Sequence, residues 1–100
     1  HAYNPYEDSA VKRMVFLPNT KRLKPDYTFL KDIEMEEIYY MSDSLRVKAY
    51  AAWPKGAKKL PAIIYNRGGN REFSKIYPYR VVDILGRMAH WGYVAIGSQY

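Results

Sequence analysis

Apolar and polar residues alternate most clearly in the middle of the chain, in the stretch LRVKAYAAW. The preceding stretch IEMEEIYYM is rich in strand-forming residues, and SDS between them supplies turn residues. Together they predict an antiparallel hairpin with one buried face. The alternation slips at Glu36 and Glu37, which indicates a bulge or a different strand boundary. The buried face is expected to carry Leu45, Val47, Ala49, Ala51 and Trp53, with Arg46, Lys48 and Tyr50 opposite.

After the turn PKGAKKLP, the pattern predicts a strand, a loop, a helix and a second strand between Pro61 and Ser98. AIIY is a short continuous apolar run, typical of a strand that is buried on both faces of a parallel sheet. Pro78 suits a first helical position and Gly92 a helix stop, and YVAIGS follows as another buried strand. This order predicts a βαβ unit and an α/β fold class. The helix is expected to bury a stripe of Val81, Ile84, Leu85 and Met88, and to pair Asp83 with Arg87.

The first 32 residues predict a short helix and a basic connector. The helix lies in EDSAVKRMVFL after an N-cap at Asp8 or Ser9, and the connector PNTKRLKPDYTF contains Pro18 and Pro25. We therefore divide the chain into an N-terminal segment, residues 1–32, and the first part of a domain, residues 33–100.

Composition is that of a folded chain of at most one domain, with 48% hydrophobic residues. The formal net charge is +6, but basic residues are scattered among acids, so Lys21, Arg22 and Lys24 are expected to form a solvated face. The absence of cysteine excludes disulfides, a thiolate nucleophile and a cysteine zinc site. No cofactor or metal is predicted. Neither a membrane-spanning run nor a secretory signal layout is present; a cytoplasmic location is favoured, and secretion after processing stays open.

A glycine pair, Gly68 and Gly69, follows the strand AIIY in the segment RGGN. A loop at the carboxyl end of a parallel strand lies where open α/β sheets bind ligands. Bare amides there suit a phosphate, an oxyanion or a tight turn. The segment matches neither the dinucleotide-binding glycine pattern nor the phosphate loop. An oxyanion hole, in which backbone N–H groups face the negative oxygen of a tetrahedral intermediate, is therefore favoured over a phosphate site.

The stretches RVKAYAAWPKGAKKLPAIIYNRGGNREFS and MAHWGYVAIGSQY resemble the amino-terminal part of the α/β-hydrolase domain of prolyl-oligopeptidase-like serine peptidases, which include dipeptidyl and acylaminoacyl peptidases. The resemblance covers residues 33–100 and implies the opening of an α/β-hydrolase sheet, a hairpin followed by a βαβ unit. It also implies that Gly68, Gly69 and Asn70 carry oxyanion-hole amides. Arg67 departs from the family pattern; it is expected to contact the oxyanion or a substrate carboxylate, or to form a salt bridge.

The 100 residues lack a catalytic triad. Ser98 has Ile96 and Tyr100 where a nucleophile elbow needs glycines, and His90 near the helix end suits a structural role. The expected function is the N-terminal segment of a serine hydrolase that cleaves peptide or, less favoured, ester bonds through an acyl-enzyme. The triad would lie in later residues. The loop strand is then expected to be an open sheet edge that pairs with the rest of the domain or with another chain.

A different class of function stays open. Basic connector residues and interleaved tyrosines would also suit a non-catalytic module that binds nucleic acid. The aromatic side chains of Tyr77, Tyr79 and Trp91 are expected to pack rather than to bind.

Overall fold

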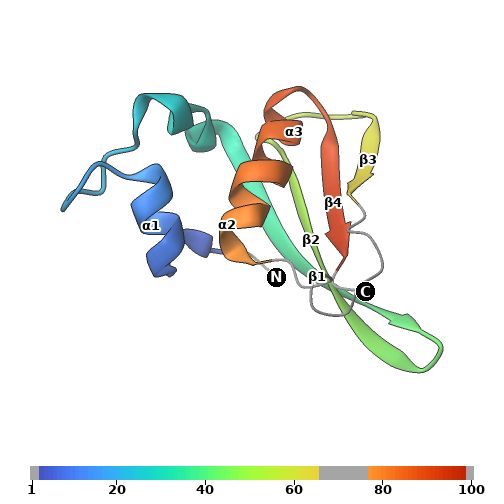
Figure 1. Cartoon of the computed structure of the whole chain (residues 1–100). Helices are drawn as coiled ribbons and strands as arrows, with labels where there is room; N and C mark the ends of the chain where they lie inside the picture. The colour runs from blue at the N-terminus through green and yellow to red at the C-terminus, as the bar shows by residue number, and fades with distance from the viewer. Residues whose placement is uncertain (1–2, 66–76, 99–100) are drawn as a thin grey trace.

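The computed structural model contains a mixed four-stranded sheet with helices packed against one face (Figure 1). It describes residues 3–65 and 77–98, without the side chain of Ser42. The strands lie in the order β1-β2-β4-β3, and the α/β class is as predicted. The elements are η1 (Pro5–Glu7), α1 (Ser9–Val15), η2 (Pro25–Asp32), β1 (Ile33–Ser42), β2 (Leu45–Pro54), β3 (Ala62–Tyr65), α2 (Pro78–Arg80), the π-helical turn η4 (Val81–Leu85), α3 (Gly86–His90) and β4 (Val94–Ser98).

The predicted hairpin is confirmed, and its turn is tight. Asp43 and Ser44, with φ of 49° and 67°, connect β1 to β2. Two central residues with positive φ match the twist of antiparallel strands. The pairing runs without interruption from Ile33 opposite Pro54 to Ser42 opposite Leu45, so neither the bulge nor the strand boundary considered at Glu36 and Glu37 is present.

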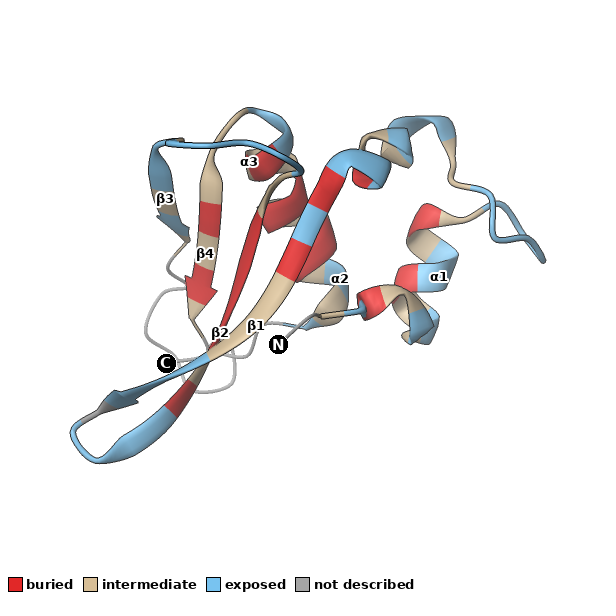
Figure 2. Cartoon of the chain, turned by 180° about the vertical axis from the view of Figure 1, so that it is seen from behind, coloured by how far each residue is buried: buried red, intermediate tan, exposed pale blue. Residues whose placement is uncertain are grey.

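The outer half of the hairpin extends past the helices, which explains why the apolar pattern slips there (Figure 1). Figure 2 shows that this part is mostly exposed, while the buried residues gather in the middle of the sheet. Glu37 lies 3.6 Å from the Lys48 ammonium and accepts a hydrogen bond from the Tyr39 hydroxyl. Polar residues can occupy this face because no helix covers it.

Burial of β2 differs from the prediction. Tyr50 was expected on the polar face, and Ala52 was assigned to neither face. They are 5% and 0% exposed and belong to the main core cluster. The ring of Tyr50 lies 4.8 Å from that of Tyr3. Ala49 and Ala51 on the other face are buried too. The expectation of a single buried face is wrong because β2 is an interior strand, flanked by β1 and β4.

The two later strands form the expected parallel pair, from Ala62 opposite Val94 to Tyr65 opposite Gly97. Among the described strands β3 pairs only with β4 and forms an edge of the sheet, as predicted for the loop strand. Ile64 is 63% exposed, so the expected burial of AIIY on both faces is wrong. An edge strand loses cover on one side, and helices pack against the opposite face of the sheet (Figure 2).

The helical segment begins at Pro78 as predicted, and Gly92, with φ of +101°, follows its end. Arg87 Nε lies 2.9 Å from Asp83 Oδ1, which confirms that pair. The buried face is rotated from the predicted stripe: Ile84 and Met88 are only partly buried. Gly86 lets the helix pack closely against Leu30 of η2, since a Cβ at Gly86 would lie 3.3 Å from Leu30 Cδ2. The buried positions are Val81, Val82, Leu85, Gly86 and Ala89.

The N-terminal helix α1 packs onto the same core as the sheet. Val11 and Val15 are fully buried and join the core cluster with Leu30 of η2. The predicted cap is Asp8, whose Oδ1 accepts from the amides of Ala10 (2.9 Å) and Val11 (3.1 Å). The helix α1 thus covers part of the core, and its first residue is set by the Asp8 cap.

Replacing Asp8 with Ala should destabilise the protein by about 1 kcal/mol, because two amides at the start of α1 lose their acceptor. The measurement is the midpoint of urea unfolding followed by circular dichroism. Asp26→Ala is the matched control, since Asp26 lies in the exposed first turn of η2 and has no capping role there. Equal losses for the two variants would contradict the cap.

Candidate functional site

The predicted oxyanion loop lies outside the described residues. Arg67, Gly68, Gly69 and Asn70 all fall within residues 66–76, so the structure does not test their roles. Its two stems are described: β3 ends at Tyr65, and the helix begins at Pro78 after Tyr77. Because β3 and β4 are parallel, the first stem, at the carboxyl end of β3, lies beside the carboxyl end of β4.

Aromatic and cationic side chains gather at the second stem. The rings of Tyr77 and Tyr79 stack at 5.9 Å with an interplanar angle of 7°, and Arg80 Cζ lies 5.7 Å from the centre of the Tyr79 ring. A side-chain hydrogen bond with Tyr79 is the main cause that raises the pKa of Arg80. Smaller electrostatic and hydrogen-bond contributions from Tyr65 act in the same direction. Arg80 Nε is buried without a hydrogen-bond partner among the described residues. No motif in the sequence pointed to Arg80.

Tyr77, Tyr79 and Trp91, which were expected to pack, are 47%, 37% and 69% exposed, and the first two rings stack on each other. They lie at the two ends of the helical segment, where the sheet does not cover them. Each end of the helical segment thus presents an aromatic surface to solvent.

Ser98 and His90 do not form a catalytic pair. His90, at the end of α3, lies against the Phe29 ring with centroids 4.8 Å apart, in keeping with a structural role. Ser98 is the last residue of β4, and its Oγ is 2.9 Å from the Tyr40 hydroxyl. His90 ends α3 before β4 begins at Val94, whereas Ser98 is at the far end of β4, so the length of this strand separates the two residues.

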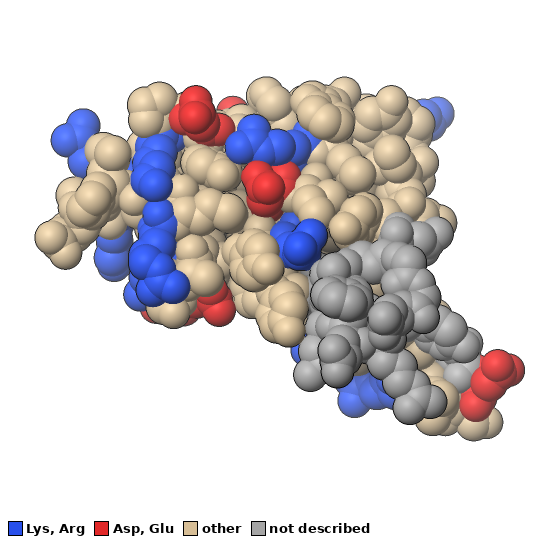
Figure 3. Space-filling model, viewed as in Figure 1, with Lys and Arg blue, Asp and Glu red and all other residues tan. Residues whose placement is uncertain are grey.

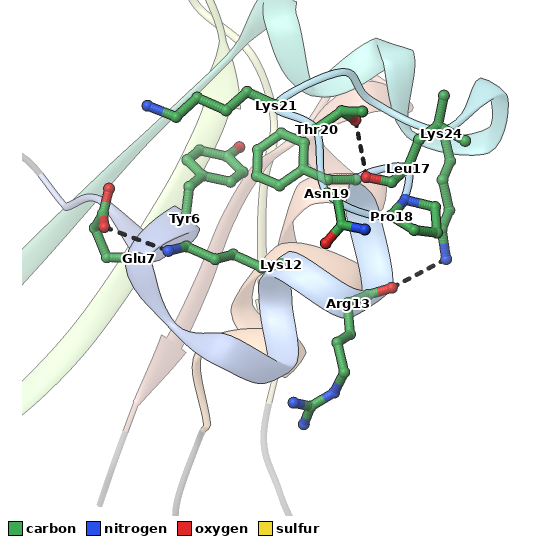
Figure 4. A pocket seen from close by; sticks show the side chains of 11 residues that line it. Tyr6, Glu7, Lys12, Arg13, Leu17, Pro18, Asn19, Thr20, Lys21 and Lys24 are labelled. Carbon is green, nitrogen blue, oxygen red and sulfur yellow. Dashed lines mark hydrogen bonds and ion pairs between the residues drawn. The ribbon is translucent and has the colours of Figure 1, made fainter.

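A basic groove on the N-terminal segment has a volume of about 970 Å³ (Figure 4). Its apolar floor includes the rings of Tyr6 and Phe16, whose centroids are 6.1 Å apart at 52°. Burial raises the pKa of Tyr6 above its ordinary value. Lys12 lies 3.6 Å from Glu7, and Lys24 Nζ donates to the Arg13 carbonyl at 3.0 Å. The charged residues that line it are Glu7, Lys12, Arg13, Lys21 and Lys24.

Hydrogen bonds hold the wall of this groove in shape. The Leu17 amide donates to the Arg22 carbonyl at 2.9 Å, and the Thr20 hydroxyl donates to the Leu17 carbonyl at 2.8 Å. Phe16 and Leu23 form an antiparallel bridge beneath this turn. The conformation of this turn is therefore set by its own hydrogen bonds, without a ligand.

A second hollow, of about 680 Å³, adjoins the first and shares Tyr6, Phe16 and Lys21 with it. No carboxylate lines this second hollow. The basic residues that line it in addition to Lys21 are Arg22, Lys31 and Lys55. Lys and Arg also gather over α1 in the space-filling view (Figure 3). The expectation that the connector's basic residues form only a solvated face is incomplete, because seven basic residues from positions 12 to 55 and one Glu line the two adjoining hollows. The cluster could not be recognised in the sequence because its residues are far apart along the chain.

Neither a metal centre nor a membrane-spanning helix is indicated in the part of the chain that the structure describes. No group of three or more His, Cys, Asp or Glu side chains there could hold a metal ion. Within the same residues, the helices are too short and too polar to cross a membrane.

Comparison with family models, curated proteins and solved structures found no match to the chain.

Proposed function

We propose that the chain forms the amino-terminal part of a serine hydrolase of the prolyl-oligopeptidase type, which cleaves peptide bonds through an acyl-enzyme. In this proposal Gly68, Gly69 and Asn70 supply backbone amides to the oxyanion hole, and Arg67 contacts the oxyanion or a substrate carboxylate. Ester substrates are the less favoured alternative. The chain contributes to the oxyanion hole and not to the triad.

The observation that carries the proposal is the parallel pairing of β3 with β4. In the sequence, the segment with the glycine pair follows β3, which ends at Tyr65, and precedes the helix that begins at Pro78. Ligands of open α/β sheets bind outside the carboxyl ends of parallel strands. The hairpin followed by a βαβ unit is also the arrangement that the resemblance implies for the start of an α/β-hydrolase sheet.

The proposal needs a nucleophile, an acid and a histidine from polypeptide outside these 100 residues. In an α/β-hydrolase the strand with the glycine loop pairs with the strand that carries the nucleophile. The edge position of β3 among the described strands supports this, because its second side is available for such a strand. The exposed side chain of Ile64 would gain cover there.

A fluorophosphonate probe tests the proposal on the product of the complete gene. We expect one serine to be labelled in the native protein and none after heat denaturation, because the reaction needs an activated nucleophile. Mass spectrometry locates the adduct, and Ser→Ala at that position serves as the matched control. The absence of an adduct on native protein, or labelling that survives denaturation, would contradict the hydrolase assignment.

A further inference from the structure

The two adjoining hollows of the N-terminal segment have no part in the proposed hydrolysis. We propose that they bind an acidic segment of a polypeptide, with an apolar side chain on the Tyr6–Phe16 floor and carboxylates against the basic rim. This site stands independently of the proposed function, because it needs no nucleophile and lies on a different segment of the chain.

Charge is the first argument for an acidic ligand. The first hollow carries four basic residues and one Glu, and the second carries four basic residues and no carboxylate. Among the described residues of this rim, Lys12 forms an ion pair with Glu7 at 3.6 Å. The Lys24 ammonium donates to a carbonyl, so its charge is not neutralised. Concave surfaces lined by one sign of charge concentrate ligands of the opposite sign.

The floor is the second argument, and it favours a peptide over nucleic acid. Tyr6 and Phe16 are both partly buried and pack against the core cluster, at 52° to each other. Successive bases stack on open ring faces, whereas an apolar side chain fits a concave floor. Leu17, 40% exposed, adds an apolar edge to the rim. The arrangement suits one apolar anchor between acidic residues.

A shaped rim is the third argument. Binding loses less free energy when the site is ordered beforehand. The turn from Leu17 to Arg22 is closed by its own hydrogen bonds, and the Lys24 amide donates to the Val15 carbonyl at 2.7 Å. Figure 4 shows Lys12 and Lys21 extending on either side of Tyr6. Two ammonium groups therefore flank the floor where an anchor residue would lie.

Fluorescence anisotropy with a labelled peptide, Glu-Asp-Phe-Glu-Glu with blocked ends, tests the site. We expect saturable binding that weakens as salt is raised. Lys21→Glu, at the residue shared by both hollows, should weaken it about three- to tenfold. Lys58→Glu makes the same change in charge at an exposed residue outside both hollows and should leave the affinity nearly unchanged. Leu17→Ser should weaken binding without altering charge, and circular dichroism checks that each variant is folded.

Three results would overturn the proposal. Equal weakening by Lys21→Glu and Lys58→Glu would mean general attraction to a basic protein. A peptide with Gly in place of Phe that binds as well would remove the role of the floor. Tighter binding of a short oligothymidylate, lost in Lys21→Glu, would assign the hollows to nucleic acid instead. Binding of the Phe peptide that exceeds both controls supports the site.

Discussion

Leu85→Ala should lower the free energy of unfolding by about 2–5 kcal/mol, because truncation of a buried Leu removes apolar contacts and leaves a cavity. Leu85 is fully buried and is among the largest such side chains of the described core. It belongs to η4, the π-helical turn that carries the buried face of the helix toward the sheet. A domain of this size has about 5–15 kcal/mol of stability, so the loss is a large fraction of the total.

Chemical denaturation with urea, followed by circular dichroism, measures this loss. Ile64→Ala is the matched control, since Ile64 is 63% exposed on the edge strand and its truncation should change stability by less than about 0.5 kcal/mol. Ile84→Ala should fall between the two, because Ile84 is only partly buried. A larger loss for Ile84→Ala than for Leu85→Ala would restore the apolar stripe predicted from the sequence and contradict the observed helix orientation.

Gly69→Val should reduce kcat about 100-fold or more in the complete hydrolase, if the amides at this position stabilise the oxyanion. Removal of one oxyanion-hole donor typically reduces kcat by about 10²–10³. The interaction forms mainly in the transition state, so KM should change much less than kcat. Steady-state kinetics on a chromogenic peptide substrate provide the measurement.

Ala57→Val is the control for Gly69→Val, because Ala57 lies in the exposed connection between β2 and β3 and takes the same side chain. It should retain the parent's kcat. A rise in KM alone for Gly69→Val would assign the loop to substrate binding and remove the oxyanion role. Retention of fluorophosphonate labelling in Gly69→Val would identify an intact nucleophile.

The two candidate sites can be tested separately because they are formed by different parts of the sequence. The stems of the glycine segment are Tyr65 at the end of β3 and Tyr77 before α2. The basic hollows are formed mainly by residues before β1, with Lys55 after β2. Loss of peptide binding in Lys21→Glu should therefore leave serine labelling unchanged.

The sequence by itself determined the local elements whose signals lie within a few residues. Asp8 caps α1, Asp43 and Ser44 form the hairpin turn, and Pro78 and Gly92 bound the helical segment. These positions follow from backbone dihedral preferences and from hydrogen bonds between near neighbours. The glycine pair is equally visible in the sequence, but its role depends on residues beyond those that the structure describes.

Only the tertiary structure decided which faces are buried and which distant residues meet. The edge position of β3 exposes Ile64, while the interior position of β2 buries Tyr50. The pattern of either strand alone gives no sign of its neighbours in the sheet. In the same way, Lys12 and Lys55 border adjoining hollows although 43 positions separate them in the sequence. Burial and charge clustering depend on long-range packing, whereas periodicity reports only the local backbone.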